Sequence, residues 1–422
     1  MAEQTLSINE TVSSKRLAIG GFFLLVAVFI FLLLFLTPGI SEQNATFILT
    51  SKRSGVTIAA PDLVFPVDVA LYILAGLTLM ITAWQFLRGF ERTTLAIVVV
   101  AGITILAFLV WATRDNALNV TGMLVSSVVR ATPIALAALS GLYSERSGVV
   151  NIGIEGMMLG GAFAAVVAAS TSNSMLIGVI AGALAGMLLG WLHAVLSIRY
   201  MVNQIISGTA IIIFALGLTS YLQRAVLNLY PQLNQPGSAI AAVPIPFLWK
   251  IPVIGPIFFN QSPIIYLMFA LVIFTQILMY QTRWGLRVRS VGEQPKAADT
   301  LGINVIRLRY MSVLISGAIA GLGGAYMSIG SAGRFNEGMS AGKGFLGLAA
   351  MIFGNWNPGG AFLGSLIFGF FDSWQEKISI LAIGIPVDLL GMAPYLATMV
   401  VLAGFVGRVR MPAADGEPYK KE

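Results

Sequence analysis

The residues best suited to chemistry gather in one polar stretch between apolar runs. This stretch is Ser144–Gly161, SERSGVVNIGIEGMMLGG, in which charged and amide side chains are mixed with glycines. Polar groups at membrane depth are costly and tend to pair or to line a cavity. Glu145 and Arg146 fit a headgroup position at the cytoplasmic face, where their charges cost little. Asn151 and Glu155 lie deeper, so we assign them to a functional site.

Arg130 stands in the middle of an apolar run and is harder to explain as a topology signal. Its side chain either snorkels to an interface or faces the protein interior, where Glu155 is the candidate partner. Asn203 and Gln204, at the start of a later apolar run, complete the candidate translocation residues together with Asn151.

The chain lacks the signatures of a catalyst. It contains no Cys and one His, His193, which excludes disulfides and Cys/His metal sites. His193 lies on an apolar run and fits a packed helix face better than a proton relay. Gly338–Gly344, GMSAGKG, departs from the phosphate-loop spacing, and no nucleophile elbow is present. We therefore expect a protein that is not an enzyme and binds no metal or cofactor; if ATP and Mg²⁺ drive it, a partner must bind them.

Composition defines the elements that hold these residues. Of the 422 residues 57% are hydrophobic and 10% charged, with a mean hydropathy of +0.87, which is far from the soluble range. The net charge of +7 comes from residues between apolar runs and predicts bilayer orientation, with no nucleic-acid polymer as partner. We expect an all-α, polytopic transmembrane bundle of about 10–12 spans, including short or broken helices.

The apolar runs locate these spans. The expected segments are Leu17–Leu36, Val67–Leu87, Thr94–Ala112, Asn119–Leu142, Val150–Ser170, Met175–Ile198, Gln204–Leu222, Pro263–Gln281, Leu308–Gly330, Phe345–Gly354, Ala361–Phe371 and Asp388–Val406. Phe345–Gly354 and Ala361–Phe371 are short and flank the turn Asn355–Gly360, as in broken or re-entrant helices. Leu17–Leu36 is longer than a signal-peptide core, so we interpret it as a membrane helix.

Charge predicts the orientation. If all twelve segments cross, 16 of the 25 lysines and arginines fall on one side, which is then cytoplasmic, and both termini face it. We divide the chain into an N-terminal extension of about three spans (residues 1–115), a glycine-rich core (116–410) and a cytoplasmic tail (411–422). The tetrapeptide Gly-Gly-Ala-Phe occurs at Gly160–Phe163 and Gly359–Phe362, a weak hint of an internal inverted repeat.

The basic segment Arg283–Arg309 is the one long polar stretch between core spans. Pro295 and Gly302 stand where a helix begins and ends, so we expect a short helix over Pro295–Leu301. Ala297, Ala298 and Leu301 would form a small apolar face on it. Such a helix suits docking into a groove of another protein; the alternative is a solvated loop whose arginines only set topology.

Three motifs carry a family resemblance. Ser144–Gly161, Ala341–Gly360 (AGKGFLGLAAMIFGNWNPGG) and GLRVRSVGEQPKAADTLGINV within the basic segment resemble permease subunits of bacterial ABC importers in the simple-sugar and branched-chain amino acid permease superfamily, with the nucleoside-uptake branch most similar. The similarity covers about Asn119 to Arg408. The helices within Leu17–Ala112 look like an addition to this core.

The resemblance implies a multi-pass subunit in the bacterial plasma membrane that imports nucleosides. Its implied partners are a second related permease, ATP-binding subunits, an extracytoplasmic solute-binding lipoprotein and membrane lipid. It assigns the coupling to the ATPase to Gly292, Glu293, Gln294, Pro295, Ala297, Ala298, Leu301 and Gly302. The alternatives are import of simple sugars or another small polar solute, and a stand-alone, ion-coupled secondary transporter.

Overall fold

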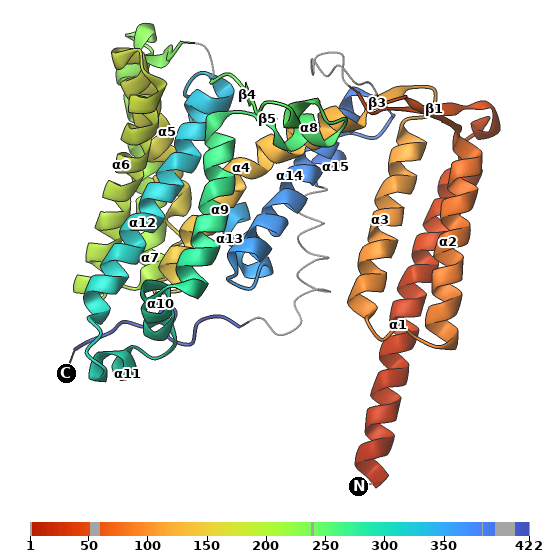
Figure 1. Ribbon diagram of the computed structural model, residues 1–422, viewed down its shortest axis with the longest axis horizontal. Helices are drawn as coiled ribbons and strands as arrows, with labels where there is room; N and C mark the ends of the chain where they lie inside the picture. The colour runs from red at the N-terminus through yellow and green to blue at the C-terminus, as the bar shows by residue number, and fades with distance from the viewer. Residues whose placement is uncertain (1, 51–59, 238–239, 382, 393–409, 422) are drawn as a thin grey trace. The chain divides into compact units, whose positions relative to one another are not determined.

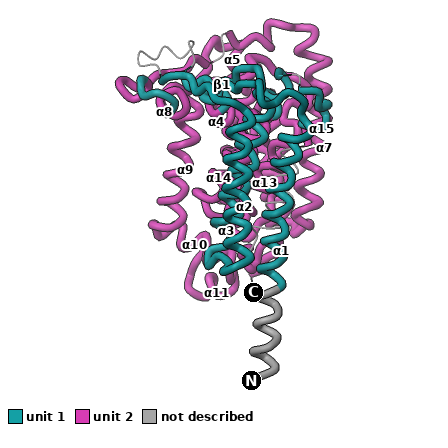
Figure 2. Tube along the Cα trace, turned by 90° about the vertical axis from the view of Figure 1, so that its right-hand side faces the viewer, with its two compact units in different colours: residues 1–123, 250–253, 375–390 teal, residues 124–249, 254–374, 391–422 magenta. Residues whose placement is uncertain are grey.

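The computed structural model describes residues 2–50, 60–237, 240–381, 383–392 and 410–421 (Figure 1). The described chain is mainly helical with five short strands, which confirms the expected all-α class. Nine of its helices are long and apolar enough to cross a membrane. Contacts divide the chain into two compact units, which Figure 2 shows in separate colours. The first comprises residues 1–123, 250–253 and 375–390, and the second comprises 124–249, 254–374 and 391–422.

The first unit is built on three helices, α1 (Ala2–Phe35), α2 (Val67–Leu87) and α3 (Thr93–Ala112). The bounds of α2 are those predicted from its apolar run, and those of α3 differ by one residue. The Arg16 guanidinium of α1 donates to the carbonyl oxygens of Gln85 and Phe86 at the end of α2. A cation there complements the helix dipole and satisfies carbonyls that have no partner within the helix.

A small sheet joins the helix ends of this unit. Strand β1 (Asn44–Ile48) pairs antiparallel with β2 (Leu63–Pro66) and parallel with β3 (Ala117–Asn119). The apolar runs predicted no element between Leu36 and Val67. Strands this short carry too few residues for a recognisable alternation of apolar and polar positions, so the pairing is a tertiary effect.

The second unit contains the remaining spans. Helix α4 (Val120–Glu145) leads into it, and short π-helical turns extend several of its helices (Val195–Arg199, Gln223–Leu227 and Tyr326–Ala332). Its other helices and strands are α5 (Ile154–Ser172), α6 (Met175–Ala194), α7 (Gln204–Leu222), β4 (Val243–Pro244), α8 (Ile254–Phe258), β5 (Asn260–Gln261), α9 (Pro263–Gln281), α10 (Arg283–Glu293), α11 (Pro295–Thr300), α12 (Val305–Ala325), α13 (Lys343–Phe353) and most of α14 (Pro358–Ile380). The end of α14 from Gln375 and nearly all of α15 (Val387–Gly391) belong to the first unit.

Helices α5, α6 and α12 form the core of the second unit and lie side by side (Figure 1). They approach through small residues: a Cβ added at Gly186 of α6 would collide with the carbonyl oxygen of Gly317 on α12. Backbones that come this close gain van der Waals contact that bulky side chains would prevent. The glycine-rich texture predicted such packing.

The region expected to hold two short apolar pieces is asymmetric. Helix α13 is short, as predicted, and ends at the turn before α14. Helix α14 continues nine residues beyond the predicted end at Phe371, through Asp372, to Ile380. The last expected span, Asp388–Val406, falls mainly on residues 393–409, outside the described residues. The number of spans therefore stays a prediction.

Candidate functional site

An ion-pair cluster lies within the second unit. Arg130 of α4 and Lys343 at the start of α13 both reach the carboxylate of Asp372 on α14; the Arg130 Nη1 to Asp372 Oδ2 distance is 3.1 Å and the Lys343 Nζ to Asp372 Oδ2 distance is 3.7 Å. The three side chains are 33%, 24% and 25% exposed, respectively. Two cations thus share one carboxylate at a partly open position, and we call this group the Arg130 cluster.

Glu155, the partner expected for Arg130, has a different role, so that prediction was wrong. Its carboxylate accepts hydrogen bonds from the backbone N–H groups of Gly342 (2.8 Å) and Gly344 (2.6 Å) at the start of α13. The first N–H groups of a helix have no partner inside the helix and carry a partial positive charge. Glu155 therefore caps α13 and fixes the backbone on either side of Lys343.

Asn151 belongs to a separate buried network. Its Nδ2 donates to the Ser316 hydroxyl of α12 at 3.0 Å, and Ser316 lies 2.9 Å from the Ser140 hydroxyl of α4. All three side chains are inaccessible to solvent. The Asn151 Oδ1 atom is buried with no hydrogen-bond partner among the described residues. This network ties the segment before α5 to two neighbouring helices.

Gln204 and His193 hold the backbone around Val150, and Asn203 caps the neighbouring helix α7. Gln204 Oε1 accepts from the Val150 N–H at 2.6 Å, and His193 Nε2 lies 2.9 Å from the Val150 carbonyl oxygen. Asn203 caps α7 by accepting from the N–H groups of Ile205 and Ile206. The packed role expected for His193 agrees with its full burial. Of the five candidate translocation residues, only Arg130 lies in the ion-pair cluster. Glu155 supports the cluster indirectly, by holding the backbone on either side of Lys343.

Glu145 and Arg146 are engaged with the turn after α13, which the sequence did not predict. Glu145 is buried and accepts from Trp356 Nε1 at 2.7 Å. The Arg146 Nε donates to the Trp356 carbonyl oxygen at 3.0 Å, and its Nη2 donates to the Tyr280 hydroxyl at 3.1 Å. The predicted position of Glu145 among the lipid headgroups was therefore wrong, because its side chain is buried in the protein. Trp356 lies 210 residues away in the chain, so no local pattern links it to Arg146.

The basic segment forms two helices, α10 and α11, of which the sequence predicted only the second. Helix α11 ends one residue before the predicted end at Leu301. The apolar face is smaller than expected, because Ala298 is buried within the chain while Leu301 is 81% exposed. Gly292 at the end of α10 contacts the carbonyl oxygen of Arg146. The α10–α11 segment thus packs against the Ser144–Gly161 stretch.

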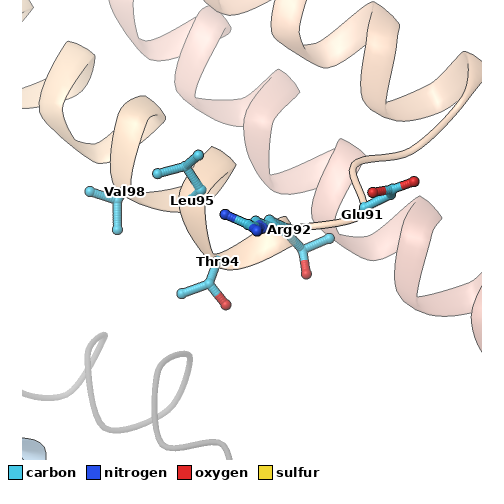
Figure 3. A pocket seen from close by; sticks show the side chains of 6 residues that line it. Glu91, Arg92, Thr94, Leu95 and Val98 are labelled. Atoms are coloured by element: carbon cyan, nitrogen blue, oxygen red, sulfur yellow. The ribbon is translucent and has the colours of Figure 1, made fainter.

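One open hollow lies elsewhere, at the start of α3 in the first unit (Figure 3). Its lining residues are Glu91, Arg92, Thr93, Thr94, Leu95 and Val98. None of the predicted site residues lines it, and it encloses no buried polar side chain. We assign it no function.

Apolar helices long enough to span a bilayer, a half-length helix and charges in the interior of the bundle together define a multi-pass membrane permease. The comparisons specify its family. The chain matches the family described as branched-chain amino acid transport system / permease component over residues 123–407, and it belongs to that family. The resemblance predicted from the sequence motifs is confirmed.

Three relatives show how the similarity is distributed. The nucleoside ABC transporter permease protein NupC of Lactococcus lactis subsp. cremoris is 39% identical over 72% of this chain and 99% of its own. The guanosine ABC transporter permease protein NupQ of Bacillus subtilis is 41% identical over 70% of this chain and 95% of its own. The putative glucose ABC transporter permease protein TsgC13 of Haloferax volcanii is 31% identical over 71% and 98%. No solved structure matches.

Proposed function

We propose that this chain is the membrane-spanning subunit of an ATP-driven importer of nucleosides. The observation that carries the proposal is the contrast among its relatives. Two relatives named for nucleosides or guanosine are 39% and 41% identical over nearly their full lengths, whereas two relatives named for glucose are 31% and 28% identical; two further relatives named for guanosine and nucleosides are 28% and 24% identical. Sugar import is the second candidate, supported by that weaker similarity.

The Arg130 cluster is the proposed solute contact. Arg130, Lys343 and Asp372 converge from three helices on a partly open position, where hydroxyl and amide groups of a solute would find both donors and an acceptor. A short helix beginning inside a bundle is the arrangement in which transporters place binding sites. Nucleosides are uncharged and rich in hydroxyl groups, so a balanced set of donors and acceptors suits them better than a purely cationic site.

The energy source is assigned to a partner. The described residues contain no group of His, Cys, Asp or Glu that could hold a metal ion, and the sequence has no phosphate-binding loop. In the proposal, ATP-binding subunits dock on α10 and α11, where Ala297 and Leu301 remain exposed. A second permease and a solute-binding lipoprotein complete the importer, with both termini of this chain in the cytoplasm.

Uptake measurements test the proposal. A strain lacking this chain should lose uptake of radiolabelled nucleosides and keep uptake of glucose and ribose, and the wild-type gene should restore it. Loss of sugar uptake with intact nucleoside uptake would replace the proposal with the second candidate. Uptake that persists when ATP is depleted but stops when the ion gradient is collapsed would instead indicate a secondary transporter.

The solute contact has a matched control in the same chain. Asp372→Ala should reduce nucleoside uptake by at least about tenfold, because it leaves two cations without their shared carboxylate. Arg224 and Glu337 form an ion pair of the same length, 3.1 Å, but their side chains are 71% and 44% exposed. Glu337→Ala should therefore leave uptake unchanged. Equal effects of the two substitutions would contradict a pathway role for the Arg130 cluster.

A further inference from the structure

The C-terminal residues 410–421, expected to be a plain tail, pack along α10. We call them the C-terminal strap. The Ala414 N–H donates to the Gly292 carbonyl oxygen at 2.9 Å, and the Ala413 N–H lies 3.3 Å from Glu293 Oε2. Figure 1 shows the strap passing α10 and ending near α11. At that end Lys421 Nζ lies 3.9 Å from the Asp299 carboxylate of α11.

A buried arginine ties the strap to the α4–α5 turn. Arg309 of α12 is 2% exposed. Its Nη1 donates to the Glu417 carbonyl oxygen at 2.8 Å, and its Nε donates to the Ser147 carbonyl oxygen at 3.2 Å. A buried charge is costly unless hydrogen bonds satisfy it, so both segments must stay in place around Arg309.

The strap also reaches the turn after α13. The Arg410 N–H donates to Asn355 Oδ1 at 2.8 Å. Further along, the Asp415 side chain is buried near Glu145, which itself holds Trp356. The strap thus contacts α10, the α4–α5 turn and the α13–α14 turn within a dozen residues. These three segments are far apart in the sequence, and the strap adds to the direct contacts of Gly292 with Arg146 and of Arg146 with Trp356.

We infer that the C-terminal strap is a positioning element that makes the α10–α11 segment and the α4–α5 turn move as one body. This inference rests on the proposed function, in which an ATPase docks on α10 and α11. A partner that displaces α10 and α11 can shift the membrane-spanning helices only if these two short helices are firmly connected to them. The flexible ends of α10 and α11 alone would not transmit the movement. Arg309 and the strap's backbone hydrogen bonds supply that link together with the contact of Gly292 with Arg146, and Arg309 acts as a positioning residue through it.

Loss of the strap should lower the number of nucleosides transported per ATP hydrolysed and leave ATP hydrolysis itself intact. The test uses the complete importer in proteoliposomes and measures both nucleoside uptake and ATP hydrolysis. A chain ending at Arg410, and separately Arg309→Ala, should still hydrolyse ATP but move about fivefold or more fewer nucleosides per ATP, the lower end of ordinary coupling free energies. Lys420→Ala, at an exposed strap position, should match the wild type. A wild-type ratio in the shortened chain would overturn the inference.

A cross-link tests the same point without removing anything. Because the chain contains no Cys, Asp299→Cys with Lys421→Cys gives one reactive pair across the α11–strap contact. A short bifunctional thiol reagent should leave the transport ratio unchanged, since the strap stays docked throughout the cycle. Blocked transport after cross-linking would show a strap that must detach, and would overturn the inference. A wild-type importer that moves no nucleoside would instead refute the proposed function and leave the strap's fivefold effect to be measured on the true solute.

Discussion

Replacing Glu155 directly tests whether the start of α13, which carries Lys343, must be held in place for transport. Its carboxylate caps α13 through Gly342 and Gly344, the residues on either side of Lys343. Glu155→Ala removes the acceptor of both backbone N–H groups, of which that of Gly344 is buried and that of Gly342 partly buried. Glu155→Gln keeps one acceptor oxygen and turns an amide NH₂ toward the other N–H. The alanine variant should therefore be the more damaging of the two.

The size of the effect follows from the two bonds. A hydrogen bond to a charged group contributes about 1.5–3 kcal/mol, and a carboxylate at a helix N-terminus adds roughly 0.3–1 kcal/mol. Two bonds at 2.8 and 2.6 Å thus predict a loss of about 3–6 kcal/mol in the free energy of unfolding for Glu155→Ala. Water reaching the partly exposed Lys343 side would move the value toward the lower bound. Glu155→Gln should lose about half as much.

Two measurements check this prediction. The apparent melting temperature of the detergent-solubilised chain should fall in the order wild type, Glu155→Gln, Glu155→Ala, and hydrogen exchange at residues 342–346 should accelerate in the same order. Nucleoside uptake should follow. Glu337→Ala removes an exposed carboxylate and serves as the control. If Glu155→Ala melts with that control and transports normally, the capping argument is refuted.

Three other predictions concern packing, charge balance and pH. Gly186→Leu should abolish stable insertion, because its side chain would enter the Gly317 backbone, whereas Gly217→Leu, with open space around it, should express normally. Lys343→Met in an Asp372→Asn background should restore part of the uptake that Asp372→Asn alone loses, since it rebalances the Arg130 cluster. Burial, together with the nearby Glu145 carboxyl and against the opposing Arg309 charge, raises the pKa of Asp415. The docked strap therefore holds a proton that the undocked strap releases, and docking should weaken by up to about 1.4 kcal/mol per pH unit between the ordinary carboxyl pKa and the raised one. Thiol labelling of Ala414→Cys, a position that is buried in the docked strap, should quicken across that range when normalised to labelling of the exposed Lys420→Cys, and Asp415→Asn should flatten the response.

The apolar runs predicted most spans to within a few residues because a bilayer fixes their length and composition. The bounds of α9, Pro263–Gln281, are those predicted. Helix α14 shows where this reasoning fails. The predicted piece stopped at Phe371 because the next residue is charged, yet Asp372 stays inside the helix since Arg130 and Lys343 neutralise it. A pairing across 242 residues leaves no trace in local periodicity.

The candidate site was predicted in its residue types more than in its contacts. Arg130, Asn151 and Glu155 stood out because polar groups are rare in apolar runs, and all three are engaged in the structure. Their partners are serine hydroxyls, backbone N–H groups and a distant carboxylate, none of which a motif specifies. The C-terminal strap was harder still to predict, because it docks largely through backbone groups that every sequence carries.

Four buried polar side chains share one physical origin. Each lies where a helix is interrupted and backbone groups lose their partners: Glu155 at the start of α13, Gln204 and His193 at Val150, and Arg309 at Ser147. Inside a membrane such groups must be satisfied by side chains, since neither lipid nor bulk water reaches them. A permease needs interrupted helices to form a solute site and to receive motion from a partner. The same interruptions therefore generate the Arg130 cluster and the contacts of the C-terminal strap. The Ser144–Gly161 stretch connects the two, because its Glu155 holds the backbone beside Lys343 and its Ser147 binds Arg309. Movement at α10 would reach Lys343 through this stretch.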